Sequence, residues 1–197
     1  MRKFFFCVLA AVCIGTGIWC GSVIRDRQTL NGELIRLHVI ANSDSEEDQR
    51  IKLLVRDAII GQLPQAESVR QAREYLQEHL SQLEACANEV LQANGCTETA
   101  QVTLGKESYP VREYDTFSLP SGVYESLRVV IGDGNGQNWW CVAFPALCMG
   151  ATSEDAAEVA VGSGFSEELT DTLTAQDGYE IRFFLLDLLG RIEKFFS

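Results

Sequence analysis

The sequence has few histidines and no closely spaced pair of cysteines. Only two histidines occur among its 197 residues, and no two cysteines form a C-x2-C pair. Structural zinc sites use four cysteine and histidine ligands at short spacings of this kind. We therefore expect no metal site and no cofactor.

Basic residues are also scarce. The chain has 16 lysines and arginines against 28 aspartates and glutamates, which gives a formal net charge of −12. Nucleic-acid binding depends on lysine and arginine to neutralise phosphates, and anionic membrane surfaces attract the same residues. The composition therefore predicts neither nucleic-acid binding nor an anionic membrane surface as a partner, and it favours a protein partner of complementary charge.

After residue 22 no stretch is long and apolar enough to span a bilayer, and the longest apolar run lies before it. Arg2 and Lys3 precede an uncharged apolar run over residues 4–19. This pattern is typical of a secretory signal or an N-terminal anchor. The run is shorter than the roughly 20 residues that span a bilayer. We expect cleavage after the triplet Cys20-Gly21-Ser22, with an uncleaved anchor over residues 1–22 as the alternative, and in either case export of the remainder.

No internal repeat or linker divides the remaining chain, so residues 33–197 are predicted to form one domain. This domain contains four cysteines, Cys86, Cys96, Cys141 and Cys148, and an exported domain with four cysteines can form two disulfides. Proximity in the sequence favours Cys86 with Cys96 and Cys141 with Cys148, but all three pairings remain possible.

Hydrophobic periodicity predicts a strand followed by two helices. Residues 33–40 alternate, with Arg36 and His38 on the polar face of a half-buried strand. A helix over 45–63 begins at Ser45, with Asp48 three residues later in a capping-box pattern, and ends at Pro64. A second helix begins near residue 68 and ends at residues 94–95.

Period-two patterns then predict strands at 101–104, 122–132 and 139–144. The turn signal at 133–136 favours a hairpin that joins the last two of these and contains both tryptophans. Residues 151–164 are expected to form a mobile loop, and residues 180–196 a strand followed by an amphipathic helix. The predicted fold class is a single α+β domain with a small, mostly antiparallel sheet.

Motifs for catalysis are weak. The glycines at 132–136 lack the Gly-Lys-Ser/Thr of a phosphate-binding loop, and Phe144 stands where a calcium loop needs glutamate. His38 with Asp44 or Asp48 could act as a general base and its orienting group in an exported hydrolase. The simpler interpretation is an exposed strand residue beside a helix N-terminus. We therefore predict no catalytic residue.

Two groups of residues are candidates for a protein interface. Trp139 and Trp140 must face opposite sides of a strand, so one can enter the core while the other is exposed as an interface anchor, although both can also be buried. The second group lies at the strand–helix junction, where Asn42, Ser43 and Asp44 exceed what helix capping requires. With their neighbours, the predicted partner-binding residues are Arg36, His38, Asn42, Ser43, Asp44, Asp48, Asn138, Trp139 and Trp140.

Two stretches of the sequence carry distinctive motifs. The first is Ile35-Arg36-Leu37-His38-Val39-Ile40-Ala41-Asn42-Ser43-Asp44-Ser45, continuing through Asp48-Gln49 and Lys52 to Val55-Arg56-Asp57-Ala58. The second is Pro120-Ser121-Gly122-x-Tyr124-Glu125, followed by Ile131-Gly132-x-Gly134-x-Gly136-x-Asn138-Trp139-Trp140-Cys141-Val142-x-Phe144-Pro145-x-Leu147-Cys148. Both stretches resemble the stage II sporulation protein R family of endospore-forming bacteria. The resemblance covers residues 34–148 and includes the order and spacing of the motifs and the export segment.

The resemblance implies a function that composition alone does not. Proteins of this family are exported from the forespore into the space between the forespore and mother-cell membranes. There they activate a membrane protease of aspartic type, stage II sporulation protein GA, which matures the precursor of sigma factor E. The family member would thus be a signal without enzymatic activity or a small-molecule substrate. An exported hydrolase using His38 and a structural envelope protein are the alternatives.

Overall fold

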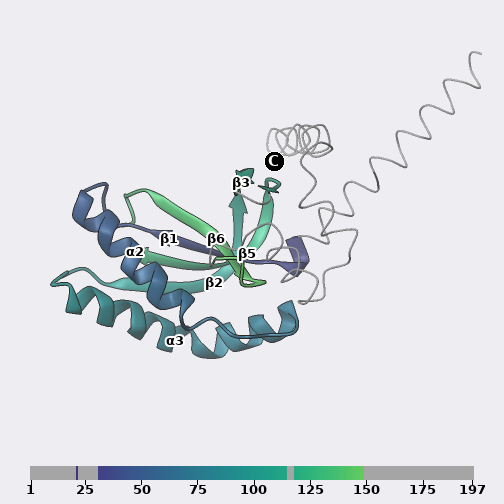
Figure 1. Cartoon of the computed structure of the whole chain (residues 1–197), viewed down its shortest axis with the longest axis horizontal. Coiled ribbons are helices and arrows are strands. Elements are labelled where there is room, and N and C mark those ends of the chain that lie inside the picture. Colours follow the sequence, from purple (N-terminus) through teal and green to yellow (C-terminus); the bar gives the residue numbers. More distant parts are fainter. Residues whose placement is uncertain (1–20, 22–30, 115–117, 149–197) are drawn as a thin grey trace, which may run out of the picture.

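The computed structural model describes Gly21, residues 31–114 and residues 118–148 of the chain, and it places two helices beside one sheet (Figure 1). In chain order the elements are β1 (Ile35–Ile40), α2 (Glu46–Ile60), α3 (Val69–Ala93), β2 (Ala100–Tyr109), β3 (Arg112–Glu113), β4 (Ser118–Leu119), β5 (Gly122–Ile131) and β6 (Asn138–Phe144). The mixed α+β class predicted from the sequence is confirmed. The predicted export segment, the loop at 151–164 and the final strand and helix lie outside the described residues.

The main sheet has four strands in the order β2-β5-β1-β6. Strand β1 pairs with β5 in parallel and with β6 antiparallel, while β2 pairs with β5 antiparallel. Two of the three pairings are antiparallel, as predicted. Strands β3 and β4 form a separate two-stranded sheet.

The predicted hairpin of β5 and β6 is wrong, because β1 lies between these two strands. The turn after β5 does reverse the chain, with positive φ at Gly132 and Gly134. It then passes the end of β1, where the amide of Asn135 donates to the carbonyl of Asn42 and that of Gly136 to the carbonyl of Ala41. A local turn signal reports the reversal but not which strand lies beside the next one.

Both described helices begin at the predicted caps. The Ser45 hydroxyl accepts from the amide of Asp48 at 3.1 Å, and the Ser68 hydroxyl accepts from the amide of Gln71 at 3.3 Å. Helix α2 is capped by Gly61, three residues before Pro64, and α3 is capped by Asn94, which Gly95 follows with φ of 71°. Of the described helices, neither is long and apolar enough to cross a membrane.

The helices cover one face of the sheet and form the larger core. Apolar side chains that alternate along the strands meet those repeating every three or four residues along α2 and α3. The fully or nearly fully buried members include Ile35, Leu37, Val39, Val55, Ile59, Leu76, Leu83, Leu91, Leu127 and Val129.

The opposite face of the sheet is also buried around β1, which corrects the predicted half-buried strand. Arg36 is 0% exposed and His38 is 5% exposed, although both alternate with core residues as a solvent-facing pair would. A second, smaller cluster of Leu34, Tyr109, Leu119, Tyr124 and Val142 lies on this face. Because β1 is central in the sheet, polarity at alternate positions indicated a polar interior and not exposure to water.

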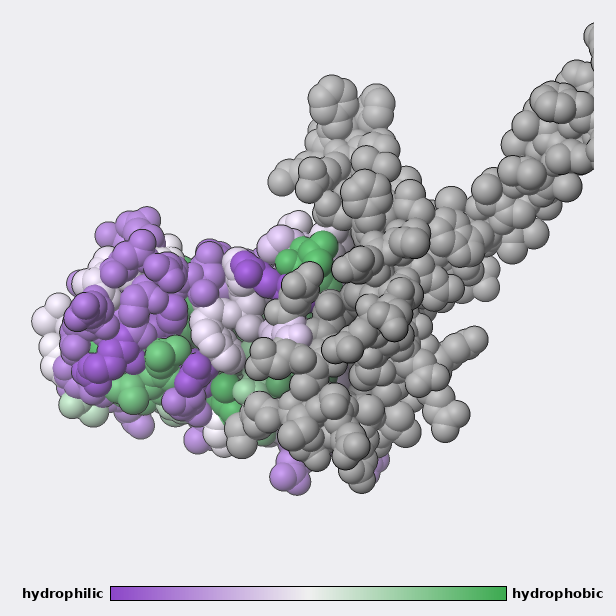
Figure 2. All heavy atoms as spheres, turned by 45° about the horizontal axis from the view of Figure 1, so that its top comes forward, coloured by the Kyte–Doolittle hydropathy of each residue, from purple (hydrophilic) through white to green (hydrophobic). Residues whose placement is uncertain are grey.

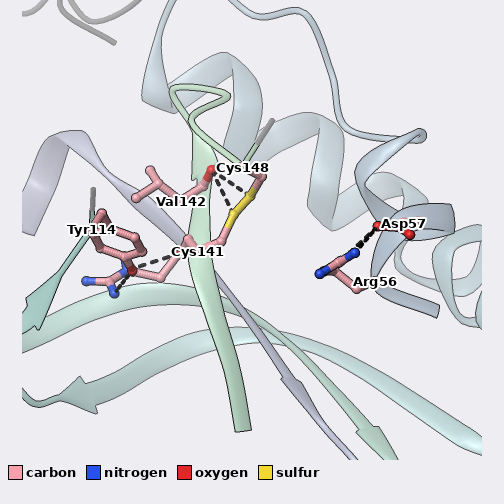
Figure 3. The surroundings of a disulfide bond; sticks show 7 residues. Arg56, Asp57, Tyr114, Cys141, Val142 and Cys148 are labelled. Atoms are coloured by element: carbon pink, nitrogen blue, oxygen red, sulfur yellow. Dashed lines mark hydrogen bonds and ion pairs between the residues drawn. A yellow bond between two sulfur atoms is a disulfide. The ribbon is translucent and has the colours of Figure 1, made fainter. Parts of the chain in front are cut away.

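One of the two favoured disulfides forms. Cys141 in β6 is bonded to Cys148, with a Cα–Cα distance of 5.4 Å (Figure 3). Cys86 and Cys96 are free, which contradicts the other favoured pair. Helix α3 continues for seven residues beyond Cys86, about 10 Å at 1.5 Å per residue. That advance takes the chain beyond the roughly 7 Å that a disulfide can bridge between Cα atoms.

Candidate functional site

The sheet face opposite the helices holds a dense group of polar and aromatic side chains, which we call the polar–aromatic face. Strand β1 supplies two of its members and β6 one, while β2 and the β3 region supply the rest. Its residues are Arg36, His38, Glu107, Tyr109, Arg112, Tyr114 and Trp140.

Arg36 lies at the centre of this face, enclosed by aromatic rings. Its Nε donates to the carbonyl of Cys141 at 3.2 Å, and its Nη2 donates to the hydroxyl of Tyr114 at 2.7 Å. The guanidinium carbon lies 4.3 Å from the ring centroid of Tyr109 and 5.1 Å from that of Tyr124. These contacts stabilise the cation through the ring faces, but they provide no negative charge.

His38 is the next inward-facing residue on β1 and has both ring nitrogens occupied. Nδ1 lies 2.9 Å from a carboxylate oxygen of Glu107, and Nε2 lies 2.9 Å from the side-chain oxygen of Asn138. The predicted pairing of His38 with Asp44 or Asp48 is therefore wrong. The partner is Glu107, which is 69 residues away in the sequence and reaches His38 from β2.

A chain of hydrogen bonds continues from Glu107 but does not form a catalytic triad. The Ser126 hydroxyl donates to the second oxygen of Glu107 at 2.9 Å, and the Tyr109 hydroxyl lies 2.7 Å from Ser126. In a nucleophilic triad the histidine lies between the serine and the acid. Here the carboxylate lies between Ser126 and His38, so this histidine does not accept the serine proton directly.

Arg112 and Trp140 form the half-buried part of the face. The guanidinium carbon of Arg112 lies 3.5 Å from the ring centroid of Trp140, and the Trp140 ring lies 5.3 Å from that of His38. Burial lowers the pKa of Arg112, and the positive charge of Arg36 adds to this effect. The two arginines thus lie close enough to repel each other.

Trp139 faces the other side of β6, as the alternation of strand side chains requires. It packs against the helix-side core, and the guanidinium carbon of Arg56 lies 4.8 Å from the Trp139 ring centroid. Figure 3 shows Tyr114 and the Arg56–Asp57 ion pair on opposite sides of β6. A pocket of about 370 Å³ beside Trp139 is lined by Arg56, Asp57, Ile60, Gly61, Trp139 and Cys148.

The polar corner between β1 and α2 is extensively hydrogen-bonded within the chain. The Asn42 side chain and the Ser43 hydroxyl both donate to Asp48, at 3.2 and 2.5 Å, and the Ser43 bond is the main reason that the pKa of Asp48 is lowered. Asp44 accepts from the amide of Gln137 at 2.7 Å. This corner therefore fixes the turn after β5 against β1.

Lys52 extends the same corner from α2. It is buried, and its Nζ donates to the side chain of Gln49 at 2.6 Å and to the carbonyl of Gln137 at 3.1 Å. Burial lowers the pKa of this ammonium group. The combination of Asn42, Ser43 and Asp44 that helix capping did not require thus has a structural role, and its contact with a partner stays a prediction.

The structure brings three of the nine predicted partner-binding residues, Arg36, His38 and Trp140, together on the polar–aromatic face. Asn138 lies beside this face and contacts His38. Asn42, Ser43, Asp44 and Asp48 gather at the corner, and Trp139 lies on the helix side. Sequence reasoning missed Glu107, Tyr109, Arg112 and Tyr114. Glu107 and Tyr109 alternate with exposed residues on β2. Their position on the buried polar–aromatic face becomes apparent only when the pairing of β2 with β5 is known. Among the described residues no group of three or more histidines, cysteines and acids could hold a metal ion.

Comparison with known proteins gives concordant results. The model of the family described as Stage II sporulation protein R matches residues 31–154. The chain is 30% identical over 180 residues to the "Stage II sporulation protein R" of Bacillus subtilis (strain 168), covering 80% of each protein. No solved structure matches. The chain therefore belongs to the stage II sporulation protein R family, and its role lies in sporulation.

Proposed function

We propose that this protein is an exported, non-enzymatic signal that activates a membrane aspartic protease of the stage II sporulation protein GA type. The protease then cleaves the precursor of sigma factor E in the mother cell. The signal is made in the forespore and acts in the space between the two membranes, either secreted or held by its N-terminal segment. Membership of the sporulation family and the apolar run that follows Arg2 and Lys3 support this proposal.

The burial and hydrogen bonds of His38 are the observation that favours a signal over a hydrolase. This side chain is only 5% exposed, and its two ring nitrogens are held by Glu107 and Asn138. A general base needs a free nitrogen within hydrogen-bond reach of the proton that it removes. The geometry therefore supports a structural role for His38, and no observation favours the hydrolase.

The character of the surface supports action through a protein contact. In the view of Figure 2 the described surface is mostly hydrophilic and is interrupted by smaller hydrophobic patches. Half-buried Trp140 under Arg112 is the kind of aromatic and arginine pair that dominates many interfaces. The chain would activate the protease by binding its active form more tightly than its inactive form. A shift from 1% to 99% active needs a preference of roughly 10⁴-fold.

Co-expression of the full chain with the protease and the sigma-factor precursor in a non-sporulating host tests this function. Cleavage of the precursor is followed by immunoblot. Cleavage is expected only when all three proteins are present, because the signal is required to populate the active protease. Cleavage that is equally efficient without this chain, or its absence when all three proteins are abundant, would refute the proposal.

A variant at His38 separates the signal from the hydrolase. His38→Gln keeps one donor and one acceptor in place of the imidazole, so a signal that folds normally is expected to retain activation. A hydrolase that used this imidazole would lose nearly all its turnover. The amount of folded protein is measured in parallel by limited proteolysis, and activity is expressed per folded molecule.

A further inference from the structure

The arginines of the described residues fall into two groups. Four form ion pairs, namely Arg50 with Glu47, Arg56 with Asp57, Arg73 with Glu125 and Arg128 with Glu107. Among the side chains that the structure describes, which do not include that of Glu113, no carboxylate pairs with Arg36, Arg112 or Arg70. Arg70 is exposed to water, which solvates its charge, whereas Arg36 is completely buried and Arg112 is half-buried.

Arg36 and Arg112 each have one buried hydrogen-bond donor without an acceptor. Nη1 of Arg36 and Nε of Arg112 are shielded from solvent and make no hydrogen bond. Buried polar groups in folded proteins nearly always have a partner, and a buried charge without one is unfavourable. Two such donors on one sheet face therefore need an explanation beyond packing.

The neighbouring tyrosines do not neutralise this positive charge. Burial raises the pKa of Tyr109 and Tyr114, and for both it outweighs the opposing effect of Arg36. Both phenols are therefore neutral at physiological pH. Glu107, the acid of this face, is already bound to His38, Ser126 and Arg128. The ring faces of Tyr109 and Tyr124 stabilise the plane of Arg36 but leave its Nη1 edge unpaired.

We propose that Arg112, with the buried charge of Arg36 beside it, forms a binding site for a carboxylate, and that its occupant is an aspartate or glutamate side chain of the partner protein. A planar carboxylate is the natural complement of the guanidinium edge, with two parallel hydrogen bonds. The Trp140 ring packs against the guanidinium of Arg112 and helps to hold it in place. Because the chain carries a net charge of −12, this positive site would select a single acidic side chain and not a long acidic segment.

This site rests on the proposed function, since it supplies a contact by which the signal binds the protease. The co-expression assay tests it with substitutions at Arg112, the more accessible arginine. Arg112→Gln is expected to reduce cleavage per folded molecule at least tenfold, and Arg112→Glu more, because charged hydrogen bonds contribute roughly 1.5–3 kcal/mol and 1.4 kcal/mol is about tenfold. Arg112→Lys is expected to retain part of the activity, since it keeps the charge but loses the two-bond geometry.

Two further variants separate charge from folding. Arg112→Met keeps an apolar stem over Trp140 without the charge, and it is expected to be abundant yet inactive. The matched control is Arg70→Gln, which removes an equal charge from an exposed, unpaired position and is expected to leave cleavage unchanged. If Arg112→Met or Arg112→Gln supports at least half of the normal cleavage per folded molecule, the carboxylate site is wrong, although the proposed function stands.

A charge exchange identifies the occupant. Each acidic residue of the extracytoplasmic part of the protease is replaced in turn by arginine and combined with Arg112→Glu. One combination is expected to restore cleavage at least tenfold over Arg112→Glu alone. Failure of every combination would overturn the assignment to a partner side chain. Crosslinking of the chain without the protease tests whether a second copy of the chain fills the site instead. A self-association that Arg112→Gln abolishes would show that it does, and would overturn the assignment to a partner side chain.

If wild-type protein produces no cleavage in the same experiment, the proposed function fails before the site is judged. The two failures are thus distinguished by the wild-type lane alone.

Discussion

The two faces of the sheet bury their side chains for different purposes. The face under α2 and α3 is apolar, and its side chains lock the helices onto the strands. The opposite face buries Arg36 and His38 among tyrosines, and two arginine nitrogens on it have no acceptor. Burial of apolar surface stabilises a fold, whereas burial of an unpaired cation opposes it. This difference is the basis of our proposal that the helix side maintains the structure and that the polar–aromatic face serves recognition.

Truncation of the helix-side core gives the largest expected effect. Leu83 on α3 is 1% exposed, and Leu83→Ala is expected to destabilise the protein by about 2–5 kcal/mol through lost burial and a residual cavity. Leu53→Ala on α2 is the control, because Leu53 is 39% exposed and its loss is expected to cost less than about 0.5 kcal/mol. Urea unfolding measures both. An equal loss of stability for the two variants would contradict the role of the helix-side core in maintaining the structure.

Reduction of the disulfide tests the link between β6 and the turn that follows it. Cys141 and Cys148 are seven residues apart, and closing so short a loop stabilises the fold by about 2 kcal/mol. Addition of dithiothreitol is expected to lower the unfolding free energy by this amount, and Cys141→Ser with Cys148→Ser is expected to remove the response. A variant with serine at the free Cys86 and Cys96 should respond like the wild type. If it does not, the pairing is different.

Removal of the central cation sharpens the contrast between the faces. Arg36→Met keeps the volume but loses the charge and the bonds to Cys141 and Tyr114. Relief of an uncompensated buried charge is expected to offset those losses, so stability should change by less than about 1 kcal/mol although Arg36 is fully buried. Activation of the protease is expected to fall strongly. A loss of stability as large as that of Leu83→Ala would instead make Arg36 a structural residue.

The polar corner is expected to give the smallest effect, and one that depends on pH. The pKa of Asp48 in the folded protein lies below its ordinary value of 3.8, chiefly because Ser43 donates to the carboxylate. The charged form therefore stabilises the fold above that value, and the contribution is lost as pH falls through the folded pKa. Asp48→Asn should cost about 1 kcal/mol near neutral pH, with the difference shrinking below pH 3.8. A difference that is constant with pH would contradict this explanation.

Local features of the fold were predictable from the sequence, and long-range ones were not. The caps at Ser45 and Ser68 and the apolar periodicity located α2 and α3 because these signals act within four residues. The insertion of β1 between β5 and β6 depends on pairings about 90–110 residues apart, which a turn signal does not report. For the same reason Arg36 and His38 were recognised as candidates, while their partners Tyr114 and Glu107 were missed.

The most direct test of the division between the two faces is sigma-factor cleavage per folded molecule for Trp140→Ala beside Leu83→Ala. Loss of the Trp140 ring removes the support of Arg112 on the polar–aromatic face. The expected result is at least a tenfold loss per folded molecule for Trp140→Ala and an unchanged value for Leu83→Ala, whose only defect is the amount that folds. Unimpaired cleavage by Trp140→Ala, or an equal loss for both variants, would contradict the assignment of signalling to this face.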